Sequence, residues 1–241
     1  MKYVKMLGLA SVAVAALMAF VGSSTASATV LCTVEGTNKA GEPTGTTCPA
    51  NEAYKGGTKI HAEFEATAEV PKAKLTTSFQ NIECEVSTVA GETINEGSAT
   101  ETVKGIVTAL TFEKCNCEVK VLKNAAGNFG ELEIHWGELV EEGGKKVFKE
   151  TGHGGTLTST GSEVTAQCNT IFGKVHCIYK TNATDIGNLT GSAETISTAT
   201  MDIEGANIPR LVTDPLCAEK ASWDAHYKVD TPDVLNVAGH T

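Results

Sequence analysis

The chain has 241 residues, with 19 basic and 29 acidic side chains and a formal net charge of −10 at neutral pH. So acidic a chain repels phosphate backbones, and the sequence has no basic patch with interleaved aromatic residues, which argues against nucleic-acid binding. The length is sufficient for one sizeable domain with its own hydrophobic core.

The first 28 residues have the parts of a cleavable export signal. Lys2 and Lys5 supply a positive start, Leu7–Val21 carries no charge, and Ala26-Ser27-Ala28 has the small-x-small pattern that signal peptidases recognise. We therefore predict residues 1–28 as a signal peptide and a mature chain that begins at Thr29. Losing the two lysines leaves 17 basic residues against 29 acidic ones, a net charge of −12. No second apolar stretch is long enough to span a bilayer, so we expect a secreted protein, extracellular or at the cell surface, with no membrane span.

The mature sequence shows the alternation of apolar and polar residues that is typical of strands. The pattern is clearest at 59–66, 131–136 and 221–229, in a chain rich in Thr and Val, whose branched side chains suit a pleated sheet. A period of two with one polar face indicates antiparallel strands over a shared core. Glycine-rich turns separate these short strands. We therefore predict an all-β fold, an antiparallel β-sandwich of Greek-key, Ig-like or jelly-roll type, with a β-barrel as the alternative.

The alternation is missing from one long stretch near the start of the mature chain. We predict residues 29–57 as an N-terminal loop region closed by a disulfide, and residues 58–241 as the β-sandwich, the two forming one domain. Charged and glycine residues at 141–146, between two apolar pairs, predict a hairpin tip.

The cysteines are the strongest structural signal in the chain, because all of them follow the predicted cleavage site. An even number of cysteines in an exported protein predicts disulfides, here four, with no free thiol. The predicted disulfide residues are Cys32, Cys48, Cys84, Cys115, Cys117, Cys168, Cys177 and Cys217.

Two pairs follow from local arguments. A two-residue turn at Phe172-Gly173 would place Cys168 directly opposite Cys177, at a non-hydrogen-bonded position within reach of a disulfide. Cys32 with Cys48 would close the irregular N-terminal stretch and stabilise the fold by restricting the unfolded chain.

The pairing of the other four cysteines stays open at this point. A bond between Cys115 and Cys117 would close a strained small ring, so each is expected to join Cys84 or Cys217. Cys84–Cys115 with Cys117–Cys217 is the preferred arrangement. A metal site at Cys115-Asn116-Cys117 would need further ligands close in sequence, which are missing, so we predict no metal and no cofactor.

The sequence supplies no catalytic motif, and we predict no catalytic or cofactor-binding residue. An HGG sequence at 153–155 resembles an oxyanion loop, but the GxSxG nucleophile motif is missing. Four histidines fall on the polar faces of predicted strands, where a histidine is usually solvated: His61, His135, His176 and His226.

Two further residue types bear on carbohydrate chemistry. Trp136 and Trp223 lie on apolar strand faces and are predicted to be core residues rather than exposed sugar-stacking platforms. Four acids could supply the two carboxylates of a glycosidase, although the sequence gives no separation between them: Glu138, Glu141, Glu142 and Asp224.

Several segments contain cysteines or predicted core residues: Cys48-Pro49, Ile82-Glu83-Cys84, Leu110-Thr111-Phe112, Cys177-Ile178-Tyr179 and Ala221-Ser222-Trp223-Asp224-Ala225. Their spacing resembles that of a group of secreted proteins of uncharacterised function, which occur as many paralogues in some Gram-positive soil bacteria. The resemblance spans nearly the whole mature chain. It implies export, disulfides and a β-rich fold, and it supplies no catalytic residue.

These observations favour an exported, non-enzymatic protein that acts in adhesion, matrix assembly or ligand binding, with an extracellular protein or polysaccharide as its partner. The alternative is a secreted hydrolase acting on polysaccharide, whose carboxylates or histidines are brought together only by the fold. A deep pocket with convergent acids or histidines would favour the hydrolase.

Overall fold

The computed structural model describes residues 29–34, 47–49, 51–142, 145–149, 154–171, 173–192, 198–211 and 215–239. The regular secondary structure of these residues consists of β-strands, which confirms the predicted all-β class. Among the same residues there is no helix long and apolar enough to cross a membrane. The predicted signal peptide, residues 35–46 and 50 of the predicted N-terminal loop, and residue 153 of the HGG sequence lie outside the described residues, as do the side chains at 138–142 and 145–149.

Sixteen strands follow one another along the chain. They are β1 (Val30–Cys32), β2 (Lys59–Phe64), β3 (Ala73–Thr76), β4 (Asn81–Thr93), β5 (Val103–Cys115), β6 (Glu118–Leu122), β7 (Glu131–Trp136), β8 (Glu138–Glu142), β9 (Lys145–Lys149), β10 (Gly154–Thr160), β11 (Glu163–Thr170), β12 (Gly173–Lys180), β13 (Thr184–Thr190), β14 (Thr200–Pro209), β15 (Lys220–Thr231) and β16 (Asn236–Ala238), all within the described part of the chain.

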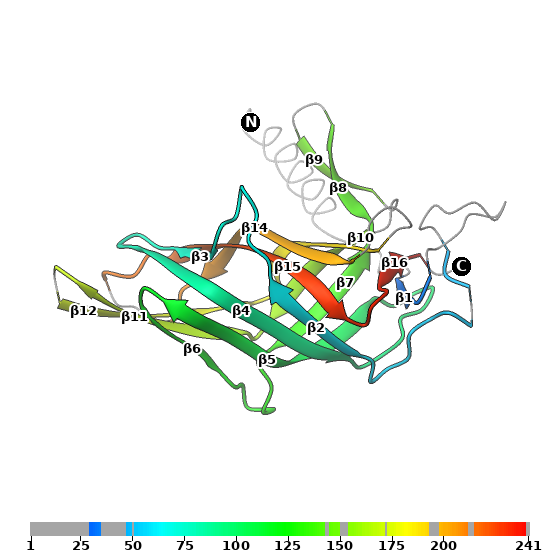
Figure 1. The fold of residues 1–241 in the computed structure, drawn as a ribbon, viewed down its shortest axis with the longest axis horizontal. Coiled ribbons are helices and arrows are strands. Elements are labelled where there is room, and N and C mark those ends of the chain that lie inside the picture. The colour runs from blue at the N-terminus through cyan, green and yellow to red at the C-terminus, as the bar shows by residue number, and fades with distance from the viewer. Residues whose placement is uncertain are drawn as a thin grey trace, which may run out of the picture.

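Eight of these strands close into an antiparallel barrel (Figure 1). The order around the ring is β14-β13-β10-β7-β5-β4-β2-β15, and β15 pairs back with β14. The short strand β3 also lies between β4 and β15. It pairs near the start of each of these strands, whereas β2 pairs with their later residues. The closed ring fits the barrel alternative and does not confirm the sandwich, because each barrel strand is hydrogen-bonded on both sides and no edge is left to separate two sheets.

The barrel bends where β4 and β5 carry glycines. The register between these strands shifts after Ala90, and a Cβ on Gly91 would stand 2.7 Å from the carbonyl oxygen of Ile106. A Cβ on Gly105 would stand 3.1 Å from the carbonyl oxygen of Glu92. Both glycines therefore permit a close backbone approach, as is common where a sheet curls into a barrel.

The inward side chains of β15 form the centre of the core. Ala221, Trp223, Ala225, Tyr227 and Val229 are all buried, which confirms the predicted inward face. The Trp223 ring makes edge-on contacts with Phe112 and Tyr227, with centroids 5.9 and 6.4 Å apart.

A short series of hydrogen bonds lies within this core. The Ser87 hydroxyl donates to the carbonyl oxygen of Thr111 at 2.9 Å, so the Tyr227 hydroxyl is the donor in its 2.8 Å bond to Ser87 Oγ. Burial raises the pKa of Tyr227 well above its usual value of 10.0, and the phenol stays protonated.

A small sheet of β12, β11 and β6 lies at one end of the barrel, at the left of Figure 1. Three disulfides lie at this end of the molecule. Cys84–Cys115 joins β4 to β5, Cys117–Cys168 joins the start of β6 to β11, and Cys177–Cys217 joins β12 to the segment before β15.

The observed disulfide pairing differs in part from the predicted one. Cys84–Cys115 and Cys32–Cys48 are the expected pairs, but Cys168 bonds Cys117 and Cys177 bonds Cys217. The predicted Cys168–Cys177 and Cys117–Cys217 pairs are wrong, and no cysteine is free.

The physical reason is the register of the β11–β12 hairpin. Thr170 pairs with Gly173, so the turn comes one residue earlier than predicted and Cys168 faces Val175. Gly173 has a φ of +101°, a conformation that glycine adopts readily and other residues rarely do. The change in register moves each residue's partner by two positions, which alters the pairing but preserves the buried face.

The other end of the barrel is covered by β1 and β16, at the right of Figure 1, which pair with each other. Three side chains at this end belong to the barrel core: Leu31 of β1, Val237 of β16, and Leu235, the residue before β16. The described part of the predicted N-terminal loop therefore includes one strand. The β8–β9 hairpin, in which Glu142 pairs with Lys145, confirms the predicted hairpin tip.

Replacing Trp223 tests the central packing. We expect Trp223→Ala to lower the free energy of unfolding by about 3–5 kcal/mol, through lost burial and the cavity left behind. Trp223→Phe should cost less, because Trp223 Nε1 is buried without a hydrogen-bond partner and an aromatic ring remains. Urea unfolding of the three proteins checks this; a Trp223→Ala variant as stable as the original would place the ring outside the core.

Mass spectrometry of unreduced peptides tests the disulfides. We expect Cys117–Cys168 and Cys177–Cys217 peptides, and no free thiol in the denatured, unreduced protein. The double variant Cys117→Ser, Cys168→Ser should be about 2–5 kcal/mol less stable. Recovery of a Cys168–Cys177 peptide, or of two free thiols per chain, would contradict this arrangement.

Candidate functional site

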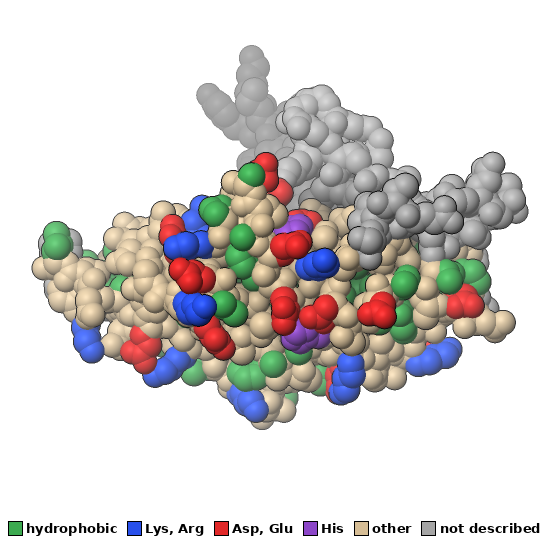
Figure 2. Space-filling model, in the orientation of Figure 1, with side chains coloured by type: hydrophobic (Ala, Val, Ile, Leu, Met, Phe, Trp, Pro, Cys, Tyr) green, Lys and Arg blue, Asp and Glu red, His purple; other side chains and the backbone are tan. Residues whose placement is uncertain are grey.

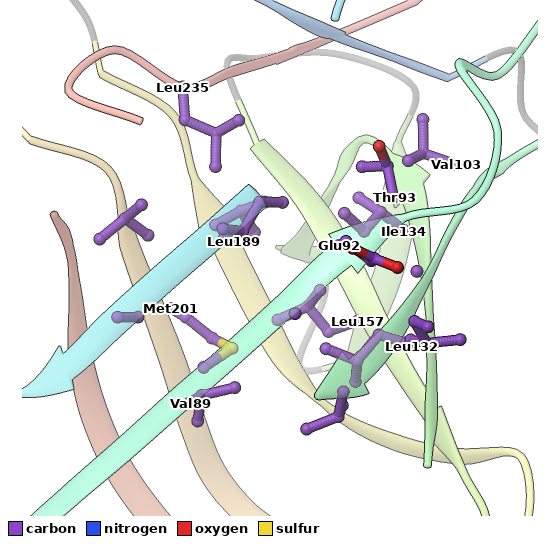
Figure 3. Close-up of a pocket in the computed structure, with 17 residues that line it drawn as sticks. Val89, Glu92, Thr93, Val103, Leu132, Ile134, Leu157, Leu189, Met201 and Leu235 are labelled. Carbon is purple, nitrogen blue, oxygen red and sulfur yellow. The ribbon is translucent and has the colours of Figure 1, made fainter. Parts of the chain in front are cut away.

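A cavity of about 70 Å³ lies inside the barrel (Figure 3). All eight barrel strands contribute to its lining, together with Leu235 beside β16, so it lies on the barrel axis toward the end that β1 and β16 cover. Leu157, Leu189 and Met201, from β10, β13 and β14, point into the same space. The cavity is a direct consequence of ring closure, because strands far apart in sequence form its opposite walls.

The lining is almost entirely aliphatic. Its two polar side chains are already bonded to residues beyond the cavity: Glu92 forms an ion pair with Lys59, and Thr93 Oγ1 donates to the carbonyl oxygen of Lys55 at 2.9 Å and accepts from the Thr58 amide at 3.1 Å. A cavity without available polar partners does not stabilise water, and apolar cavities of this kind stay dry.

The volume limits what the cavity can hold. Engineered cavities of about 150 Å³ accept benzene or xenon, and pockets for drug-sized ligands measure about 300–1,000 Å³. At about 70 Å³ the barrel interior has room for a small apolar molecule or the end of an alkyl chain.

The four histidines lie outside this cavity and do not converge. His61 and His226 project outward from β2 and β15, His135 lies on β7, and His176 is exposed on β12. Their predicted position on the polar strand faces is confirmed, since none of them joins the buried core.

Three of the histidines have acidic partners that the sequence alone did not reveal. His61 Nδ1 lies 2.8 Å from both carboxylate oxygens of Asp230, and His135 Nε2 lies 3.9 Å from Glu133. His226 is bonded to Asp202 through Nδ1 and lies 3.8 Å from Glu65 through Nε2. His61 and Asp230 lie on the neighbouring strands β2 and β15, and the partners of His226 come from β14 and from the residue after β2, so no local pattern shows them. Among the described residues, these are the acidic partners of the three histidines.

The other residues considered for chemistry have structural roles. Both Trp136 and Trp223 are buried, as predicted. The Asp224 carboxylate accepts a hydrogen bond from the Gly205 amide at 2.9 Å and lies 3.8 Å from Lys74 Nζ, outside the cavity.

A wider groove of about 590 Å³ lies at the opposite end of the molecule, between the β11–β12 hairpin and the segments around 78–80 and 215–216. Its described lining residues include the exposed Ile171 and Leu216 and contain no titratable side chain. The groove therefore offers apolar contact and amide or hydroxyl hydrogen bonding, but no acid or base for hydrolysis.

Comparison with known proteins gives no relative: no family model matches the chain, and no curated protein or solved structure is similar to it.

Substitution of two alanines tests whether the cavity is empty. Ala62 lines the cavity, whereas Ala225 is buried on β15 outside it. We expect Ala62→Val to leave the free energy of unfolding unchanged or to raise it by about 1 kcal/mol, because its added methyl groups enter empty space. Ala225→Val should lower it by about 1–3 kcal/mol through overpacking. Urea unfolding measures both, and equal losses in the two variants would argue against the cavity.

Proposed function

We propose that the protein is an exported, non-enzymatic barrel that binds a small apolar molecule, or the end of an alkyl chain, inside its ring of strands. The observation that carries the proposal is the aliphatic cavity on the barrel axis. Eight-stranded barrels are just wide enough to be filled by side chains or to hold one small ligand, and here part of the axis is left unfilled.

Export is the second part of the proposal. The predicted signal peptide and the resemblance to secreted proteins support it. Four disulfides are typical of an oxidising compartment outside the cytosol. Cys84–Cys115 links two neighbouring strands of the barrel.

The cavity would recognise its ligand by size and shape, since it offers no available polar group. A ligand of about four non-hydrogen atoms gains at most about 6 kcal/mol, which corresponds to a dissociation constant no tighter than roughly 40 μM. Such binding suits capture and release of an abundant ligand. The polysaccharide hydrolase has weaker support, because neither the cavity nor the groove gathers acids or histidines among the described residues. A pocket of about 240 Å³ beside β3 does gather Glu69, Glu83 and Asp224. Lys72 and Lys74 lie 3.8 Å from the Glu83 and Asp224 carboxylates there and offset their charge.

Xenon is the probe of choice, because it is small, apolar and free of any polar anchor. We expect methyl resonances of Val89, Ile134, Leu157 and Leu189 to shift under xenon pressure in carbon-13 NMR spectra, with saturation at a single site. Ala62→Val should abolish these shifts, and Ala225→Val, which lies outside the cavity, should retain them. Shifts that are missing, or that are unchanged in Ala62→Val, would overturn the proposal.

A further inference from the structure

We propose that His61, Glu63 and Asp230 form a binding site for a divalent transition-metal ion of the Zn²⁺ type on the outer face of the barrel. One ligand atom from each residue lies within 4.8 Å of the other two. The site is separate from the apolar cavity, because Ala62, between His61 and Glu63, points inward and lines that cavity.

The strand geometry explains why these side chains meet. His61 and Glu63 are two residues apart on β2 and so share its outer face. On the neighbouring β15, Val229 pairs with Ala62 and Thr231 pairs with His61, which leaves Asp230 as the extra residue of a β-bulge. Bulges re-aim side chains at functional sites, and here the Asp230 carboxylate lies against the imidazole ring, 2.8 Å from Nδ1.

The donor set fits a transition metal better than calcium or magnesium. One imidazole nitrogen and two carboxylates make three protein ligands, the number that open zinc sites use, with a further position left for water. Calcium takes six to eight oxygen ligands, and magnesium also prefers oxygen. Two negative carboxylates beside a neutral imidazole balance the charge of a divalent ion.

The ligands are accessible and close to the required spacing. The side chains of His61 and Asp230 are 35% and 44% exposed, so an ion can reach them from solvent. Atoms bound at about 2.0 Å in a tetrahedral site stand roughly 3.3 Å apart, so an ion entering between His61 Nδ1 and Asp230 would displace the carboxylate only slightly. Lys228 lies opposite Glu63 in the ladder and opposes binding, whereas Lys59 is engaged by Glu92.

The second histidine on this face provides a matched control. Figure 2 shows histidine side chains beside acidic ones on the visible face. The two ring nitrogens of His226 serve different carboxylates, Asp202 at Nδ1 and Glu65 at Nε2. Because these nitrogens point to opposite sides of the ring, the three groups cannot converge on one ion.

Calorimetric titration of the purified, disulfide-bonded protein with zinc chloride tests the site. We expect one ion per chain at pH 7.5. His61→Gln and Asp230→Asn should each weaken binding at least tenfold, and His226→Gln should change it less than twofold. Calcium chloride should bind at least tenfold more weakly than zinc chloride.

Melting curves in excess chelator establish that each variant is folded before its titration is compared. Three results would overturn the assignment: no binding up to about 1 mM zinc, binding that His61→Gln does not alter, or equal losses in His61→Gln and His226→Gln. The last two would place the ion elsewhere on the acidic surface.

Discussion

The pairing of β14 with β15 is the constraint on which the rest of the structure depends. It closes the ring along a ladder that runs from Thr200 opposite Lys228 to Pro209 opposite Lys220. Closure gives every barrel strand two hydrogen-bonded neighbours and removes the exposed edges that invite aggregation. It also fixes the diameter of the interior, so the inward side chains of all eight strands share one core. The small axial cavity is the space that these side chains leave unfilled.

The covalent links stabilise this ring at both ends. Cys115, Asn116 and Cys117 carry the chain from β5 to β6. On one side of this corner Cys84–Cys115 links two barrel strands, and on the other Cys117–Cys168 links the start of β6 to β11 within the small sheet. Cys177–Cys217 adds a second connection from β12 to the segment before β15. The opposite end relies on the β1–β16 pair and Cys32–Cys48. Because long closed loops restrict the unfolded chain most, these links stabilise a fold dominated by contacts between distant residues.

The barrel wall separates two kinds of chemistry. Its inner face is largely apolar, with aliphatic side chains around the cavity and the aromatic rings of Trp223 and Phe112 elsewhere in the core, and it favours apolar ligands. Its outer face presents charged side chains, among them the groups around His61. The same strand, β2, contributes Ala62 to one site and His61 to the other. Binding inside and binding outside therefore depend on different side chains and can be altered independently.

The sequence by itself determined which side of each strand faces the core, because strand alternation is a local property. The inward positions of Trp136 and Trp223 and the outward position of His61 follow from it. Only the tertiary structure decided whether the strands form a barrel or a sandwich, since both have the same alternation and closure joins strands far apart in the chain. A turn one residue earlier than expected changed the partner of Cys168. His61 and Asp230, 169 positions apart, meet only because β2 and β15 are neighbours in the ring.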